Sequence, residues 1–106
     1  MAGYFKLSAA KYRHSLNSSE TSKQLATSSV ELVGVLITGG GSSIAVRIID
    51  SKAGSGEAGP GPRNLLIGAN SGESFQYDIP TPMTEGLYAE IEQGSPFNGE
   101  AVIFYR

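Results

Sequence analysis

The 106-residue chain contains no cysteine and a single histidine. Without cysteine it can form neither disulfides nor a cysteine-based zinc site, and thiolate chemistry is excluded. The histidine, His14, lies in a polar segment with no second histidine and no acidic cluster beside it, which argues against both a metal site and a Ser-His-Asp triad. We therefore expect no cofactor, no metal ion and no enzymatic activity.

Long apolar runs are also absent. No stretch approaches the roughly 20 residues needed to cross a bilayer, and the N-terminal residues lack the apolar segment of a secretory signal. We therefore expect assembly in a cytoplasm and no membrane partner. The 14 glycines and 5 prolines, with 40% hydrophobic residues, are typical of one all-β domain with many turns.

The most apolar stretch, Val30–Thr38, is predicted to be a central strand. Seven of its nine residues are apolar or glycine, and four of these seven are β-branched, which, together with Gly34 inside the run, disfavours a helix. Because it is apolar on both faces, it must be covered on both. At period two, Val33, Val35 and Ile37 are expected to point one way, and Leu32 and Leu36 the other.

The remaining chain alternates between short apolar segments and turn residues. We expect strands over 44–50, 64–69, 73–79, 86–92 and 100–105, and two weaker ones over 11–16 and 22–27. The turn Gly39–Gly41 is expected to join Val30–Thr38 and 44–50 in a hairpin, and Pro80 and Pro82 are expected to end the strand before them. Eight antiparallel strands predict a single β-sandwich of jelly-roll type.

Three patterns that suggest chemistry have simpler explanations. Residues 54–59 match G-x-G-x-x-G, but prolines and a strand follow where a dinucleotide site needs a helix, so the segment 51–62 is expected to be an exposed loop. Glu90 and Glu92 have the spacing of a glycosidase pair, yet they fit a solvated strand face better. The aromatic residues Tyr88 and Phe97 could stack on a sugar or on a protein partner.

Charge is unevenly distributed. Residues 1–28 carry four basic residues against Glu20 alone, whereas residues 29–106 carry four basic and nine acidic residues. This predicts an N-terminal arm over residues 1–16, which can include a first edge strand, on a sandwich body over 17–106. Four scattered cations are too few to predict direct nucleic-acid binding. Partner contacts are expected from the aromatic and basic residues of the arm and from one exposed body residue: Tyr4, Phe5, Lys6, Lys11, Arg13 and Tyr88.

The succession of residues 31–38, a glycine turn and residues 45–50, followed by Gly86-Leu87-Tyr88 and a last strand at 101–105, resembles small β-sandwich virion proteins of tailed bacteriophages. The resemblance covers about residues 22–106. The loop 51–62 is longer than in that group, and the basic leader is not part of its pattern.

The resemblance implies a structural protein that decorates or cements the capsid by bridging capsid subunits. Its partner would be the major capsid protein. The protein would lie on the capsid surface after assembly in the host cytoplasm, and it would form a homo-oligomer, with a trimer favoured. A head–tail connector or tail-associated protein is the alternative within the same class. A carbohydrate-binding module is the alternative from another class.

Overall fold

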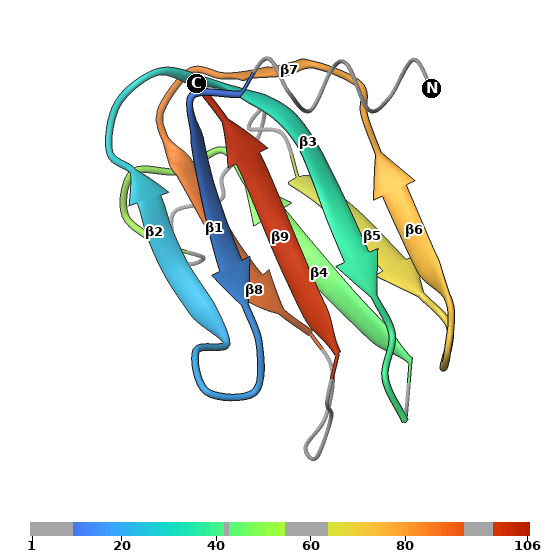
Figure 1. The fold of residues 1–106 in the computed structure, drawn as a ribbon. Helices are drawn as coiled ribbons and strands as arrows, with labels where there is room; N and C mark the ends of the chain where they lie inside the picture. The colour runs from blue at the N-terminus through green and yellow to red at the C-terminus, as the bar shows by residue number, and fades with distance from the viewer. Residues whose placement is uncertain (1–9, 42, 55–63, 93–98) are drawn as a thin grey trace.

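A computed structural model describes residues 10–41, 43–54, 64–92 and 99–106, and these form two antiparallel sheets packed face to face (Figure 1). The expected all-β antiparallel sandwich is therefore confirmed. The strands are β1 (Tyr12–Leu16), β2 (Ser22–Ala26), β3 (Val30–Thr38), β4 (Ile44–Ile49), β5 (Asn64–Ala69), β6 (Ser74–Tyr77), β7 (Thr81–Met83), β8 (Leu87–Ile91) and β9 (Glu100–Tyr105).

Sheet A has the strand order β1-β9-β3-β6, with the short β7 also paired to β3. Sheet B has the order β2-β8-β4-β5. At one lateral edge of the sandwich β1 contacts β2, and at the other β5 contacts β6 (Figure 1). Most neighbouring strands are thus far apart in sequence. In both sheets, strands from the first third of the chain lie beside strands from the last third.

The longest strand, β3, is central as predicted, but its two faces are not those that strict alternation predicts. The pairing of β3 with β9 is irregular between Leu32 and Gly34, as in a β-bulge. One extra residue reverses the face on which the following side chains lie, so Leu32 shares the core with Val35 and Ile37. Val33 is buried but does not belong to that core cluster.

The predicted hairpin between β3 and β4 is wrong, because the two strands belong to different sheets. The glycine segment between them packs against the turn 70–73, where the Gly39 N–H donates to the Glu73 carbonyl oxygen at 2.7 Å. A Cβ atom at Gly39 would lie 2.2 Å from the Asn70 carbonyl oxygen. These glycines therefore permit a close backbone crossing between the sheets rather than a tight hairpin.

A strand that was not predicted, β7, contains Pro82, where the prolines were expected only to end a strand. It pairs with the N-terminal part of β3 and places Met83 in the core. Pro82 itself is exposed on an edge strand, where its missing N–H leaves no ladder partner unsatisfied.

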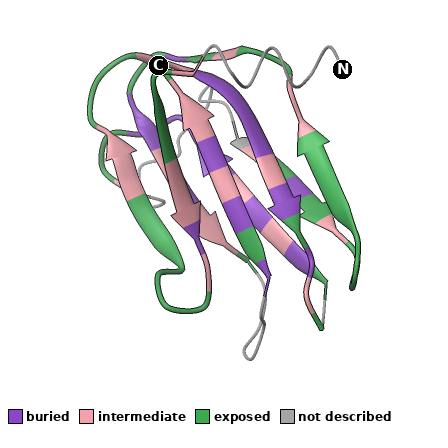
Figure 2. Cartoon of the chain, in the orientation of Figure 1, coloured by how far each residue is buried: buried purple, intermediate pink, exposed green. Residues whose placement is uncertain are grey.

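The core fills the space between the sheets and draws on both of them. Buried residues lie on the inner strands of each sheet and exposed residues on the lateral strands (Figure 2). Three large apolar residues on or near these lateral strands are largely exposed, namely Leu66 (60%), Phe75 (48%) and Ile79 (59%). Each lies on or just after β5 or β6, the two strands that end their sheets.

Candidate interaction surfaces

The basic edge consists of β1, β2 and the exposed cations Lys11, Arg13 and Lys23. The Lys11 ammonium lies 5.7 Å from the centroid of the Tyr12 ring, which is half exposed. The Tyr12 ring lies 5.3 Å from that of Tyr105, whose pKa is raised by burial and by the neighbouring Tyr12. Arg13 is exposed and has no ion-pair partner among the described residues.

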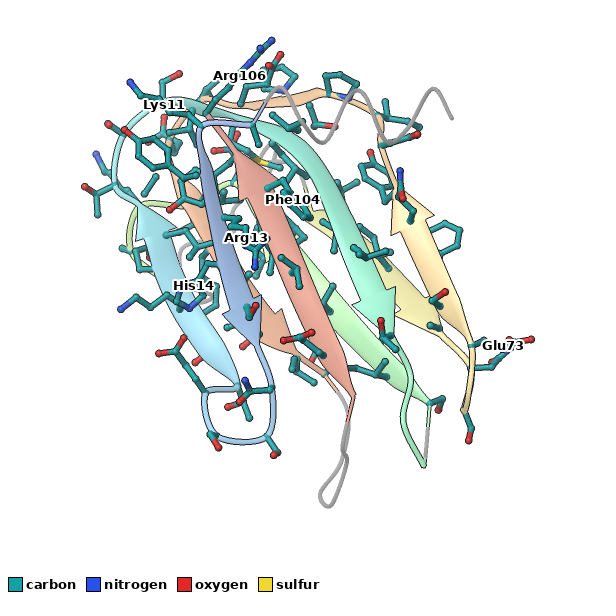
Figure 3. All side chains as sticks on the ribbon, in the orientation of Figure 1. Lys11, Arg13, His14, Glu73, Phe104 and Arg106 are labelled. Atoms are coloured by element: carbon teal, nitrogen blue, oxygen red, sulfur yellow. The ribbon has the colours of Figure 1, made fainter. Side chains whose placement is uncertain are left out.

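Of the six residues expected to contact a partner, Tyr4, Phe5 and Lys6 lie outside the described residues. Lys11 and Arg13 lie on the basic edge, at the start of β1 (Figure 3). The segment expected as an arm over residues 1–16 thus contains an edge strand, β1, which pairs with β9 along its whole length.

The opposite lateral edge, here called the acidic edge, consists of β5, β6 and the segments next to them. It carries the exposed apolar side chains named above together with the carboxylates of Glu73 and Asp78. The segment 70–79 that carries these two carboxylates contains no lysine or arginine. Within the described part of the chain, neither Glu73 nor Asp78 has an ion-pair partner.

Both lateral edges expose strand backbone. β1 and β6 are the end strands of sheet A and β2 and β5 those of sheet B, so one side of each carries N–H and C=O groups that no described strand pairs. Proline protects the edge at β7, but β6 contains none. An open edge with exposed apolar side chains is a surface suited to strand addition by another chain.

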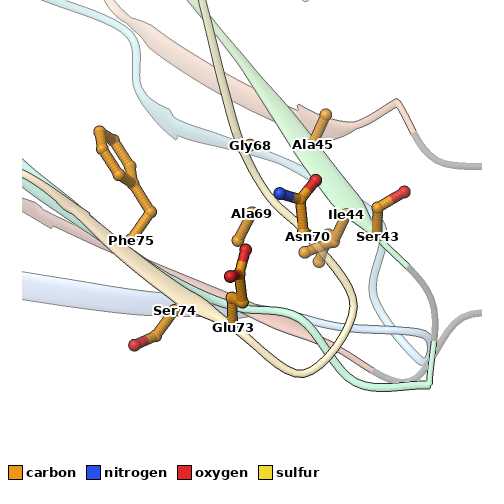
Figure 4. A pocket seen from close by; sticks show the side chains of 9 residues that line it. All are labelled: Ser43, Ile44, Ala45, Gly68, Ala69, Asn70, Glu73, Ser74 and Phe75. Carbon is orange, nitrogen blue, oxygen red and sulfur yellow. The ribbon is translucent and has the colours of Figure 1, made fainter.

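A hollow of about 380 Å³ opens on the acidic edge at the end of the β4–β5 pair (Figure 4). Its walls combine the Phe75 ring, the Glu73 carboxylate and the Asn70 amide with the backbone of Gly68. Its volume lies near the lower limit of small-molecule pockets. An aromatic or cationic side chain would match this lining.

The outer face of sheet A is unusually apolar. Ala101 and Ile103 point into the core, so Val102 and Phe104, which alternate with them on β9, point outward. Val102 pairs across the sheet with Leu36 of β3, and all three outward side chains are half-buried. Phe104 is the cross-strand neighbour of Arg13 (Figure 3), so a cation borders this apolar stripe.

Tyr88, the remaining predicted contact residue, lies on the outer face of sheet B. Its hydroxyl donates to the Glu90 carboxylate at 3.4 Å, and nearby Arg47 forms an ion pair with Glu92. Since β8 belongs to the other sheet, Tyr88 and Arg13 lie on opposite faces of the sandwich. The structure therefore does not bring Tyr88 together with Lys11 and Arg13.

Asp50 is a buried acid that sequence reasoning missed. Its side chain is 2% exposed and accepts hydrogen bonds from the backbone N–H groups of Thr84 (2.9 Å), Glu85 (2.7 Å) and Gly86 (3.2 Å), and from the Thr84 hydroxyl. Burial acts to raise the pKa of Asp50, but these four hydrogen bonds outweigh it and lower the pKa below its ordinary value. A carboxylate saturated in this way fixes the turn between β7 and β8 and is structural.

Gln24 has a related role at the start of the loop that follows β4. Its amide nitrogen donates to the carbonyl oxygens of Ser51 (2.7 Å) and Ala26 (2.8 Å), and its amide oxygen accepts from the Gly54 N–H at 2.8 Å. The sequence offers no local signal for this contact, because it joins residues 30 positions apart.

The described residues include no group of three or more histidine, aspartate or glutamate side chains that could hold a metal ion. They also include no helix long and apolar enough to span a membrane. Neither the family models nor the curated proteins compared with the chain match it.

Proposed function

We propose that the protein is a structural virion protein of a tailed bacteriophage, which decorates the capsid and bridges its subunits after assembly in the host cytoplasm. The observation that carries this proposal is the apolar outer face of sheet A. An antiparallel sheet with one face in water normally presents polar side chains there. Leu36, Val102 and Phe104 break this pattern on the two central strands of the sheet.

A protein surface would cover this stripe with a gain in free energy. Completing the burial of a large apolar side chain contributes up to about 1.5–3 kcal/mol, with less expected here because the three residues are already half-buried. The major capsid protein is the partner that this proposal requires.

We also assign the sandwich to the jelly-roll class as part of the proposal. Sheet orders β1-β9-β3-β6 and β2-β8-β4-β5, with successive strands mostly alternating between the sheets, are those of an eight-stranded jelly roll with β7 added. Viral capsid and lectin domains both use this architecture. The fold is therefore compatible with the proposed role without being specific to it.

The test replaces Phe104 by threonine, which keeps β-propensity and removes the apolar ring. We expect the Phe104→Thr protein to remain folded and to bind purified capsids at least about tenfold more weakly in co-sedimentation. Leu66→Thr is the matched control, because Leu66 is exposed on the outer face of sheet B. Equal binding by the Phe104 variant and the wild type would refute attachment through sheet A.

Cryo-electron microscopy of the particle separates decoration from a connector or tail role. Copies on the order of hundreds per particle support decoration, whereas a single ring of about 6 or 12 copies supports a connector. The carbohydrate alternative would place a sugar on Tyr88, beside Glu90 and Arg47 on sheet B. Glycan binding that Tyr88→Ala abolishes, with no binding to capsids, would favour that alternative.

A further inference from the structure

We propose that copies of this chain associate head to tail, with the basic edge of one copy docked on the acidic edge of the next. The partner is a second copy because one molecule carries both complementary surfaces. One edge presents Arg13 beside the exposed Tyr12 ring, and the other presents Asp78 beside exposed Ile79; neither charged side chain has an ion-pair partner within residues 10–41, 43–54, 64–92 and 99–106. This inference goes beyond the proposed function and can be tested without any capsid.

Strand direction supports this arrangement. The four strands along sheet A alternate in direction, so β1 and β6 run opposite ways (Figure 1). The same holds for β2 and β5 in sheet B. A second copy placed alongside by rotation about an axis parallel to the strands would therefore continue the antiparallel pattern, with its β1 next to β6 of the first.

One register of that pairing satisfies both charge and apolar contacts. Side chains on paired strands face each other on the same side of a sheet. Placing Arg13 opposite Asp78, which follows β6 directly, puts the exposed Tyr12 opposite the exposed Ile79. Opposite charges then meet on the outer side of sheet A, and exposed apolar side chains meet on its inner side.

The symmetry of the product follows from this interface. The two surfaces differ, so the contact is heterologous and no closed dimer can satisfy it. Each added copy leaves one free edge of each kind until a ring closes. The smallest closed assembly of this kind has three copies, which is also the state that the sequence resemblance favours.

Charge reversal tests the interface in the full-length protein, by sedimentation velocity and light scattering from about 1 to 100 µM. We expect the wild type to form species of three or more copies. Arg13→Glu and Asp78→Lys should each weaken association by about tenfold or more, because like charges then face each other. The double variant should recover it. Lys52→Glu and Glu85→Lys carry the same charge changes at exposed positions that lie on neither β1 nor β6, and they should leave association unchanged.

Cysteine crosslinking gives a second test that does not depend on charge. The natural chain has no cysteine, so Tyr12→Cys and Ile79→Cys proteins can be mixed and mildly oxidised. Cross-strand neighbours lie within disulfide reach, so we expect a 12–79 crosslink between copies. Replacing either partner by Lys52→Cys should give none.

Three results would overturn the proposal. The first is a wild-type protein that stays monomeric or forms a closed dimer over this range. The second is association that responds to the reversals no more than to their controls, or that the double variant fails to recover. The third is the absence of the 12–79 crosslink in an associated wild-type background. Retention of capsid binding in any of these cases would leave the proposed function standing.

Discussion

Replacing Asp50 by asparagine removes one oxygen acceptor and one charge from a site that is otherwise unchanged in size. In the best orientation of the new amide, its oxygen keeps the N–H groups of Glu85 and Gly86 that Oδ1 now accepts. The NH₂ group then faces the Thr84 N–H, which loses its acceptor, while the Thr84 hydroxyl can rotate to accept. One buried unsatisfied donor costs about 1–3 kcal/mol, and the loss of charge assistance on two hydrogen bonds adds about 1 kcal/mol. We expect a loss of about 2–4 kcal/mol in the free energy of unfolding at pH 7.

The pH dependence supplies a sharper check. The pKa of Asp50 is lowered in the folded protein, so the folded state binds this proton more weakly than the unfolded chain. The contribution of Asp50 is therefore complete above its unfolded pKa, which is the ordinary aspartate value of 3.8, and is lost as the pH falls through the folded pKa. The stability difference between wild type and Asp50→Asn should narrow below about pH 4.

Urea denaturation followed by circular dichroism at pH 7, 5 and 3 measures both effects. Glu85→Gln is the matched control, because it removes one negative charge from the same turn at a side chain that is 59% exposed. We expect that variant to change stability by less than about 0.5 kcal/mol. An Asp50→Asn penalty under about 1 kcal/mol at pH 7, or one that is equal at all three pH values, would refute the reasoning.

Two further changes test other features of the fold and of its attachment. Gly39→Ala should destabilise the protein by about 2 kcal/mol or more in the same denaturation assay. The reason is that the new Cβ atom would lie 2.2 Å from the Asn70 carbonyl oxygen, so the crossing between the sheets would have to shift. A denaturation midpoint equal to that of the wild type would contradict this contact. Deleting residues 1–9 should leave the sandwich folded but weaken capsid binding, because the core described here runs from Leu16 to Ile103 and Tyr4, Phe5 and Lys6 are expected to contact a partner. Loss of the folded circular-dichroism spectrum would make those residues part of the core, and unchanged binding would exclude them from the interface.

Strand positions were predictable from the sequence because they depend on local pattern. The bounds of β3, β5 and β9 agree with the predicted ones to the residue. The core residues of β4 and β8 do alternate with a period of two, since a regular strand with one buried face must show this pattern.

Strand partners were not predictable in the same way. Nothing in the residues of β3 and β4 shows that each pairs with strands from the second half of the chain. The bulge beside Val33 likewise depends on the register with β9. Exposure of Phe75 and Ile79 follows from the edge position of β6, which is a property of the whole sheet.

The candidate surfaces were likewise predictable only where a local sequence pattern marks them. The sequence predicted Lys11 and Arg13 as contact residues because a basic segment stands out against an acidic body. It did not predict that the exposed apolar residues of β5 and β6 gather with Glu73 and Asp78 at a single edge. Asp50 was missed because its partners lie 34–36 residues away, in a turn with no pattern of its own.

The position of β9 has a consequence for biosynthesis. β9 lies between β1 and β3, so sheet A cannot close until residues 100–105 have left the ribosome. Until then β3, the most apolar strand, can pair on one side at most, and its open side can capture strands from other nascent chains. Most of the sheet therefore folds only after β9 has been made, and its folding speed is limited by a search for contacts between distant segments. Expression at low temperature or with a holdase chaperone should raise the yield of soluble protein more than any change to the lateral edges.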